Sequence, residues 1–453
     1  MSLHPLNKLI ERHKKGTPVG IYSVCSANPF VLKAAMLQAQ KDQSLLLIEA
    51  TSNQVDQFGG YTGMRPEDFK TMTLELAAEN NYDPQGLILG GDHLGPNRWT
   101  KLSASRAMDY AREQIAAYVK AGFSKIHLDA TMPLQNDATD SAGRLPVETI
   151  AQRTAELCAV AEQTYRQSDQ LFPPPVYIVG SDVPIPGGAQ EALNQIHITE
   201  VKEVQQTIDH VRRAFEKNGL EAAYERVCAV VVQPGVEFAD QIVFEYAPDR
   251  AAALKDFIES HSQLVYEAHS TDYQTAPLLR QMVKDHFAIL KVGPALTFAL
   301  REAIFALAFM EKELLPLHRA LKPSAILETL DQTMDKNPAY WQKHYGGTKE
   351  EVRFAQRFSL SDRIRYYWPF PKVQKALRQL LKNLQQISIP LTLVSQFMPE
   401  EYQRIRQGTL TNDPQALILN KIQSVLKQYA EATQIQNSLT FTQNQNSLAM
   451  ERL

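Results

Sequence analysis

Ionisable side chains end four short apolar runs within the first 270 residues of the chain. The segments are 45–51, 86–93, 125–131 and 264–271, and each carries a carboxylate, an imidazole or both near its end. Carboxylates and imidazoles are the side chains that most often transfer protons and bind metal ions in proteins. The C-terminal ends of parallel barrel strands meet at one mouth, where barrel enzymes carry out their chemistry. The four endings together therefore predict a single site.

Two of these residues, His93 and His269, are candidate metal ligands. A lone histidine at a strand end is more often a hydrogen-bonded structural residue, but two imidazoles that converge at one mouth favour a shared metal ion. Neutral imidazole is a common zinc ligand, and a catalytic zinc site needs a third protein ligand. Glu237, shortly after the sixth apolar run, is the candidate. We therefore expect His93, Glu237 and His269 to bind a divalent metal, with zinc as the first choice.

The carboxylates of Glu49, Asp92 and Asp129 are candidate catalytic groups. Carboxylates crowded beside a cation can act as acid and base on a sugar carbon next to a carbonyl group. The alternative is a structural ring in which they hold one another and nearby Lys or Arg in ion pairs. His127 lies two residues before Asp129, so both side chains leave a strand on the same face. The sequence leaves both roles open.

Lys291 and two glycine-bearing loops are further candidates for the same mouth. Lys291 ends the eighth apolar run and is a candidate for substrate or phosphate binding; it could form a Schiff base or simply neutralise the carboxylates. The loops are 58–63 and 184–188, and the second contains Gly187 and Gly188. Their amide groups could bind a phosphate, as barrel loops often do, or the loops could be only tight turns.

Two arginines far along the chain are candidates for the same role. Arg363 and Arg365 lie among aromatic residues in segment 359–368. Helical spacing favours a packed helix face over an anion site. If the segment folds over the mouth, however, either guanidinium could bind a phosphate through its planar fork.

Eight apolar, β-branched runs alternate with helix-length amphipathic segments over residues 1–314. The runs are 20–26, 45–51, 86–91, 125–131, 176–181, 227–233, 264–270 and 288–294. Apolar runs without alternation are typical of strands buried on both faces. Eight strand–helix repeats predict a (β/α)8 TIM barrel. An open doubly wound sheet is the alternative, but no GxGxxG turn follows the first run.

The rest of the chain shows no strand pattern. Residues 315–434 read as amphipathic helices joined at prolines, and they predict a helical appendage that serves as a lid or as a subunit contact, so a homo-oligomer is possible. Residues 435–453 are rich in Gln, Asn, Ser and Thr and are expected to be disordered.

Composition narrows the classes of function. A formal net charge of -3 provides no cationic field for nucleic acid. Three cysteines without CxxC spacing favour a reducing compartment. The most apolar helical stretch, 296–310, contains Arg301 and Glu302 and is no membrane span, and the first residues lack an apolar signal stretch. We expect a cytoplasmic protein that uses neither a membrane nor nucleic acid.

Long strings of the sequence resemble the Z subunit of tagatose-1,6-bisphosphate aldolase, the GatZ/KbaZ-type family. They are 47–64, 89–97, 122–129, 231–238, 266–275, 289–303 and 361–369. The resemblance implies a non-catalytic partner that supports the activity and stability of a separate class II aldolase subunit in the breakdown of galactitol or N-acetylgalactosamine. Some members carry the name tagatose-6-phosphate kinase, but the chain contains no GxxxxGK[ST], HRD or DFG motif.

That family is in turn distantly similar to the class II fructose-bisphosphate aldolases. Asp92 and His93 match their Asp-His pair, in which Asp transfers a proton and His binds zinc, and His269 matches a second zinc histidine. The remaining zinc histidine has no counterpart in 233–238, and segment 270–273 replaces the glycine-rich phosphate loop. We therefore expect an accessory subunit. The rival hypothesis is a metal-dependent ketose or ketose-phosphate epimerase that works alone.

Overall fold

The computed structural model describes residues 3–180, 183 and 196–435. Two expectations from the sequence fall elsewhere. Gly187 and Gly188 lie outside the described residues, and so does the polar tail beyond residue 435.

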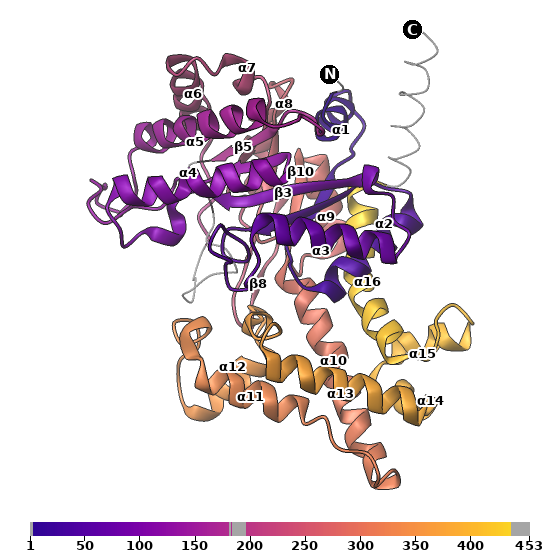
Figure 1. The fold of residues 1–453 in the computed structure, drawn as a ribbon. Coiled ribbons are helices and arrows are strands. Elements are labelled where there is room, and N and C mark those ends of the chain that lie inside the picture. The colour runs from indigo at the N-terminus through magenta and orange to yellow at the C-terminus, as the bar shows by residue number, and fades with distance from the viewer. Residues whose placement is uncertain (1–2, 181–182, 184–195, 436–453) are drawn as a thin grey trace.

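Eight parallel strands form a closed barrel (Figure 1). Each apolar run identified in the sequence overlaps one of these strands, and nearly all of the strand side chains are buried. In order along the chain they are β1 (Ile21–Val24), β2 (Leu46–Thr51), β3 (Leu87–Leu94), β4 (Lys125–Leu128), β5 (Val176–Gly180), β6 (Val227–Val231), β9 (Val265–Ala268) and β10 (Phe287–Val292). The predicted (β/α)8 barrel is confirmed.

Helices between the strands cover the outside of the barrel, which explains why the strands are apolar on both faces. They are α2 (Pro29–Asp42), α3 (Pro66–Glu79), α4 (Ala104–Ala121), α5 (Val147–Gln167), α6 (Val201–Lys217), α8 (Pro248–Glu259), α9 (Ala276–Lys284) and α10 (Pro294–Leu314). Between α6 and α8 lie a short helix, α7 (Glu221–Tyr224), and a hairpin of β7 (Glu237–Phe238) and β8 (Val243–Phe244).

The N-terminal helix α1 (Pro5–Lys14) closes one end of the barrel. Its capping residue, His4, forms a hydrogen bond between Nε2 and Oγ of Ser124 at 3.0 Å. Ser124 comes directly before β4, so α1 lies at the N-terminal ends of the strands. The C-terminal ends remain available for a site.

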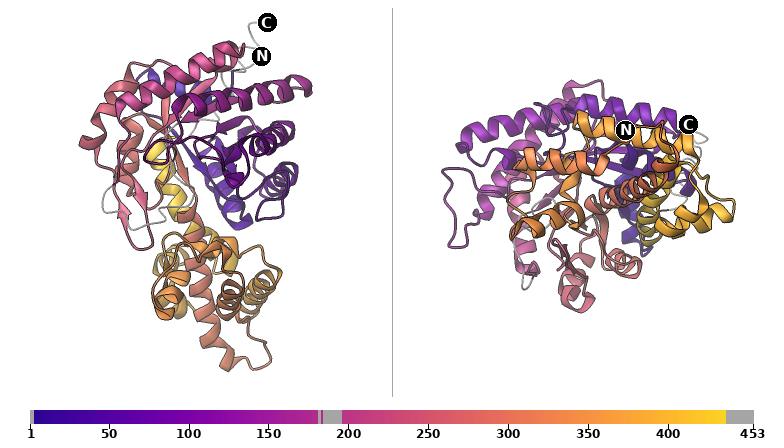
Figure 2. Two further views of the ribbon diagram at one scale, coloured as in Figure 1. Left: turned by 90° about the vertical axis from the view of Figure 1, so that its left-hand side faces the viewer. Right: turned by 90° about the horizontal axis from the view of Figure 1, so that it is seen from below.

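A second group of helices lies beyond the barrel (Figures 1 and 2). It consists of α11 (Ile326–Lys336), α12 (Lys349–Phe358), α13 (Pro371–Ile387), α14 (Leu391–Phe397) and α15 (Pro399–Arg406), and α10 extends from the barrel into it. Segment 359–366 ties this group to the barrel loops, because Tyr273 Oη donates to the Leu360 carbonyl at 2.6 Å and the Leu360 amide donates to the Asp240 carbonyl at 2.9 Å.

The last described helix, α16 (Pro414–Thr433), returns to the barrel. It packs against α2, α9 and α10, and Tyr429 Oη donates to the Thr271 carbonyl at 2.7 Å. Residues 315–434 therefore comprise a helical group that projects from the barrel and a final helix that belongs to the barrel wall. The sequence pattern of α16 is that of any amphipathic helix and does not show which surface covers it.

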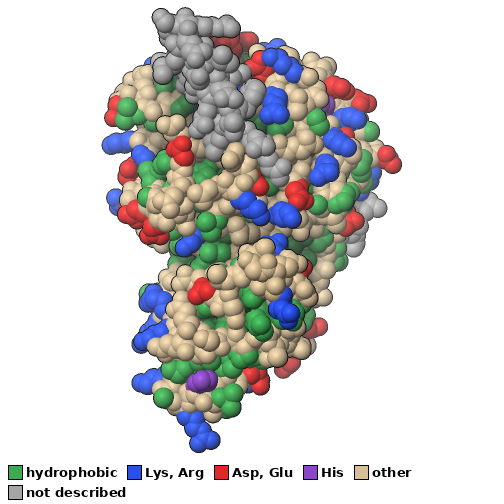
Figure 3. Space-filling model, turned by 90° about the vertical axis from the view of Figure 1, so that its right-hand side faces the viewer, with side chains coloured by type: hydrophobic (Ala, Val, Ile, Leu, Met, Phe, Trp, Pro, Cys, Tyr) green, Lys and Arg blue, Asp and Glu red, His purple; other side chains and the backbone are tan. Residues whose placement is uncertain are grey.

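The surface agrees with the modest net charge. Over the barrel, Lys and Arg side chains are interspersed with Asp and Glu on the face drawn in Figure 3. None of the helices in the described ranges combines the length and the apolar character that a membrane span requires.

Candidate functional site

An irregularity in β3 brings two consecutive side chains into the mouth. Side chains alternate between the two faces of a regular strand, so neighbours normally point in opposite directions. The pairing of β3 with β4 shifts register between Gly91 and Leu94, and His93 has a φ of 50°. A non-glycine residue in the left-handed region is uncommon and is often found at functional sites. This bulge is what allows Asp92 and His93 to face the same centre.

Four buried residues at the mouth could hold a metal ion. The possible ligand atoms of Asp92, His93, His127 and His269 all lie within 4.8 Å of one another. The imidazole ring centroids are 4.8 Å apart for His93 and His269, and 5.0 Å apart for His93 and His127. Two ligands of one zinc ion at about 2.1 Å can be at most about 4.2 Å apart, so a small inward adjustment would suffice. Three imidazoles and one carboxylate fit zinc or a similar divalent ion.

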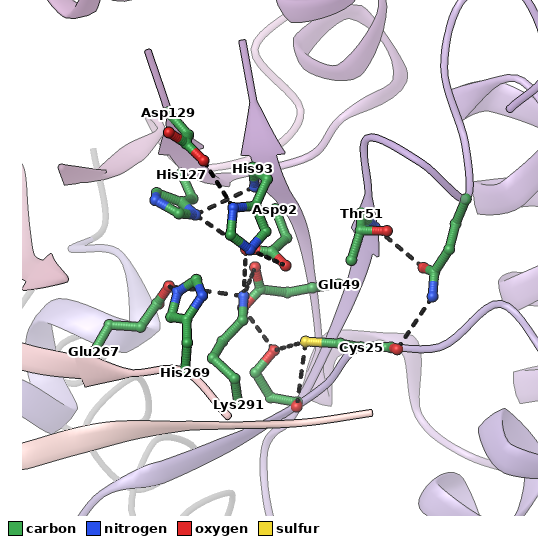
Figure 4. Close-up of polar contacts among 12 residues, drawn as sticks. Cys25, Glu49, Thr51, Asp92, His93, His127, Asp129, Glu267, His269 and Lys291 are labelled. Atoms are coloured by element: carbon green, nitrogen blue, oxygen red, sulfur yellow. Dashed lines mark hydrogen bonds and ion pairs between the residues drawn. The ribbon is translucent and has the colours of Figure 1, made fainter. Parts of the chain in front are cut away.

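The carboxylates of Asp129 and Glu267 orient two of these imidazoles. Asp129 Oδ2 lies 2.8 Å from His93 Nδ1, and Glu267 Oε1 lies 3.0 Å from His269 Nε2 (Figure 4). Such carboxylate–imidazole pairs fix the ring and its tautomer in metal sites. Asp129 also accepts a hydrogen bond from Thr131 Oγ1 at 2.7 Å. Its position therefore suits an orienting role more than direct contact with a substrate.

The pKa values of these imidazoles differ. Burial lowers the pKa of His93, but the charges of Asp92 and Asp129 outweigh burial and raise it. Burial lowers the pKa of His269 to about 3, so this ring is neutral at physiological pH. Neutral imidazole is the form that binds a metal, and a metal at His93 must compete with a proton.

A buried ammonium group supports the floor of the site. Lys125 Nζ lies 2.7 Å from Glu49 Oε1 and 2.6 Å from Glu267 Oε2, and all three side chains are fully buried. A Cβ atom at Gly90 would lie only 2.7 Å from the Glu49 side chain and 3.3 Å from that of Lys125. Gly90 therefore leaves the room that this ion pair occupies. Glu49 is held beneath the mouth and does not line the pocket described below.

Lys291 is the second cation of the network. Its Nζ lies 2.8 Å from Glu49 Oε2 and 2.7 Å from Asp92 Oδ1 (Figure 4). Burial lowers its pKa, but the surrounding groups, with Asp92 foremost, raise it well above the usual value. A Schiff-base lysine must be neutral to attack a carbonyl group. Of the two roles that the sequence left open, this environment favours the neutralising cation.

The formal charges of the cluster leave room for a divalent cation. Four carboxylates (Glu49, Asp92, Asp129 and Glu267) surround two ammonium groups (Lys125 and Lys291), for a formal charge of -2 before any histidine is protonated. Uncompensated buried charge is costly, so a divalent ion at the four-residue group would stabilise the folded state.

A pocket above the cluster is lined by residues of both the barrel and the appendage. It is lined by Asp92, His93, His269 and Lys291 from the barrel and by Arg365 and Tyr366 from the segment after α12. The segment thus reaches the mouth. Arg363 does not line this pocket; it contacts His344 Nδ1 at 2.9 Å and Tyr366 Oη at 3.3 Å instead. A phosphate-binding role for either arginine stays a prediction.

Glu237 stands apart from the four-residue group. It lies on β7, and its Oε1 accepts a hydrogen bond from the Phe238 amide at 2.9 Å. Burial raises the pKa of Glu237 to about 7. Its role as a metal ligand stays a prediction, whereas the structure adds His127, which the sequence did not single out as a ligand, to the group. The signal in the sequence was the two-residue spacing of Lys125 and His127 on β4 and of Asp129 directly after it.

The loop 58–63 is a closed turn. The amides of Phe58 and Gly60 both donate to Asp56 Oδ1 at 2.8 Å, so these two donors are already used. The turn interpretation of this loop therefore agrees with its hydrogen bonds.

The fold and the mouth define a (β/α)8 barrel protein with a buried, metal-competent group of histidines. A sequence model of the family described as D-tagatose-1,6-bisphosphate aldolase subunit GatZ/KbaZ-like matches residues 6–434, and the chain belongs to this family. A crystal structure of a probable tagatose 6 phosphate kinase from Sinorhizobium meliloti 1021 is 43% identical, with a TM-score of 0.82 over 91% of this chain and 100% of that one.

Two more distant structures resemble the fold. The YdjI aldolase from Escherichia coli K12 is 10% identical, with a TM-score of 0.40 over 86% of this chain and 98% of that one. The fructuronate-tagaturonate epimerase UxaE from Cohnella laeviribosi is 11% identical, with a TM-score of 0.44 over 92% and 82%. Similarity at this level has no bearing on the activity of the chain.

Proposed function

We propose that this chain is an accessory subunit of tagatose-1,6-bisphosphate aldolase. It would support the activity and stability of a separate class II catalytic subunit in the breakdown of galactitol or N-acetylgalactosamine. The observation that carries this proposal is the family match over residues 6–434.

Two features of the mouth support the absence of independent aldolase activity. Segment 233–238, where the resemblance calls for a further zinc histidine, has none, and Gln233 Oε1 accepts hydrogen bonds from the amides of Gly235 at 2.8 Å and Val236 at 3.1 Å. The loop after β9 places Asp272, rather than a glycine-rich phosphate cradle, against the start of α10.

Association with the catalytic subunit tests this proposal. A partner that binds only the folded state stabilises it by an amount that grows with the logarithm of its concentration above the dissociation constant. The thermal half-life of the catalytic subunit should lengthen as this chain is added, and the two should co-elute from a sizing column. A catalytic subunit that neither co-elutes with saturating amounts of the chain nor lives longer in its presence would contradict the accessory role.

The four-residue group at the mouth favours a second candidate function. A metal-dependent ketose or ketose-phosphate epimerase could hold its metal with the imidazoles of His93, His127 and His269, and it would need an ionised carboxylate beside them in a pocket. Burial raises the pKa of Asp92, but His93 and Lys291 outweigh burial and hold it well below the usual value, so Asp92 is ionised at neutral pH. A divalent metal bound there would supply a Lewis acid for the substrate carbonyl group.

The chain's own residues would then move a proton and orient the sugar. Asp92 would take the proton of a hydroxyl group while the adjacent carbon–carbon bond breaks into an aldehyde and an enediolate. The bond would form again on the opposite face of the aldehyde as the proton returns, so the reaction is redox-neutral. Chelator-sensitive epimerisation of a ketohexose 6-phosphate by the chain alone, lost in Asp92→Asn, would establish this candidate, and its absence in metal-supplemented protein would exclude it.

A further inference from the structure

The usual phosphate position of a barrel mouth is occupied by the chain itself. Barrel enzymes often bind phosphate at the loops after the seventh and eighth strands and at a helix N-terminus. Here those strands are β9 and β10, and Asp272 Oδ1 accepts hydrogen bonds from the amides of Gly293 at 3.0 Å and Ala295 at 2.8 Å. Burial raises the pKa of Asp272 to about 6, so it is largely ionised at neutral pH. A phosphate at this position would meet a like charge.

Arg365 supplies positive charge elsewhere in the same pocket. It donates to the Asp362 carbonyl and to Tyr366 Oη, both at 3.1 Å, and also to the Ser361 carbonyl. A nearby acid, Asp362, forms its ion pair with Arg301 at 3.2 Å. Among the described residues, no carboxylate oxygen lies within 4.0 Å of a guanidinium nitrogen of Arg365, the distance limit for an ion pair. Its direct hydrogen-bond partners are neutral oxygens, and the charges of Asp362 and Asp272 act on it only from beyond ion-pair distance, so no carboxylate is bound directly to the guanidinium group.

Tyr366 responds to this positive potential. Its phenol oxygen accepts hydrogen bonds from Arg365 at 3.1 Å and from Arg363 at 3.3 Å. Burial raises the pKa of Tyr366, but the two guanidinium charges outweigh burial and leave the pKa below its usual value of 10.0. Burial alone would raise the pKa of a phenol, so a lowered pKa in a buried phenol indicates a positive local potential that favours negative charge.

We propose that Arg365 binds the phosphate of a ketose phosphate whose carbonyl end lies at Asp92, His93 and His269. The inference rests on the proposed function, because it assigns the ligand class of the same mouth. Asn53 and Gln54 line the pocket as well and suit the hydroxyl groups of a sugar. The planar guanidinium fork matches the geometry of phosphate oxygens. The helical appendage thereby contributes a residue without which the barrel site is incomplete.

Calorimetric titration of the full-length, zinc-supplemented protein tests the assignment. The probes are D-tagatose 6-phosphate, D-tagatose, a ketohexuronate and inorganic phosphate. Wild type should bind the sugar phosphate roughly 10- to 100-fold more tightly than the free sugar, as a charge-assisted pair allows. Arg365→Gln should abolish this preference and leave affinity for D-tagatose unchanged. Arg365→Lys should retain part of it, because the charge remains but the fork is lost.

The matched control is Arg353→Gln. Arg353 lies on α12 and pairs with Asp331 at 2.6 Å, so this variant removes the same charge from the same group of helices without touching the pocket. It should keep the full preference. Folding of each variant is checked by its melting curve, and should Arg365→Gln not fold, Arg365→Lys carries the test.

Three results would overturn the proposal. The first is equal wild-type affinity for the phosphorylated and the free sugar, and the second is tighter binding of the ketohexuronate than of the sugar phosphate. The third is an unchanged preference in Arg365→Gln or, where that variant does not fold, in Arg365→Lys. If the chain had no effect on the catalytic subunit but bound the sugar phosphate in an Arg365-dependent way, the accessory role would be excluded and this inference would stand.

Discussion

Asp129 Oδ2 lies 2.8 Å from Nδ1 of His93, and both side chains are buried at the C-terminal ends of neighbouring strands. The contact leaves the other ring nitrogen of His93 to face Asp92, whose Oδ2 is 3.7 Å away. This carboxylate–imidazole pair is the arrangement by which proteins orient a metal-binding histidine. It makes Asp129 a positioning residue.

Replacing Asp129 by Asn should weaken metal binding about 10- to 100-fold, because the ring loses the negatively charged acceptor that fixes its orientation and tautomer. Competition with a chromophoric chelator measures the change. Asp140→Asn, on an exposed loop, is the control and should have no effect. Equal affinities for wild type and Asp129→Asn would show that His93 is not a ligand oriented by Asp129.

Metal content should separate the two possible ligand sets. His127→Ala removes a member of the buried group, so we expect it to lose most of its zinc. Glu237→Gln lies outside that group and should keep its zinc. Elemental analysis of metal-supplemented, desalted protein gives the answer. A zinc-replete His127→Ala beside a zinc-free Glu237→Gln would restore the ligand set expected from the sequence.

Lys125→Met should destabilise the protein by about 3–5 kcal/mol, the range seen when one partner of a buried ion pair is removed. The variant removes one buried cation from Glu49 and Glu267 and leaves Lys291 as the remaining cation beside them. Urea unfolding measures the difference, with the exposed Lys120→Met as control. A loss no larger than that of the control would mean that Lys291 alone neutralises both carboxylates.

Asp272 should make stability depend on pH. Its pKa is 3.8 in the unfolded chain and about 6 in the folded protein, because burial disfavours the charge. Between pH 4 and 6 the folded state therefore holds a proton that the unfolded state has lost, and stability falls as pH rises through this window. The difference between the two pKa values corresponds to about 3 kcal/mol.

Asp272→Asn keeps the acceptor for the amides of Gly293 and Ala295 but cannot ionise. Its stability relative to wild type should rise by up to about 3 kcal/mol between pH 4 and pH 7. Unfolding free energies at the two pH values measure this change. A difference that stays constant across the window would contradict the shifted pKa.

The strands were predictable from the sequence because barrel strands are apolar on both faces. Each run, such as 125–131, can be recognised from the sequence alone, without any knowledge of the tertiary structure. Asp92, His93 and His269 could be placed at one mouth for the same reason, since strand ends converge in a barrel, whereas Glu49 lies beneath the mouth.

The remaining details depend on contacts that the sequence does not encode locally. The bulge that turns Asp92 and His93 to the same side comes from the pairing of β3 with β4. His127 becomes a candidate ligand only when that bulge brings His93 beside it. The return of α16 to the barrel is set by packing against α2, α9 and α10, which lie far away in the sequence.

Aldol cleavage of D-tagatose 1,6-bisphosphate, measured as this chain is titrated into a fixed amount of the catalytic subunit, tests the accessory role most directly. We expect no cleavage by the chain alone and a saturable rise in the cleavage rate and in the active lifetime of the mixture. Cleavage by the purified chain without the partner would contradict the accessory role. So would a partner whose rate and lifetime do not change when saturating amounts of the chain are added.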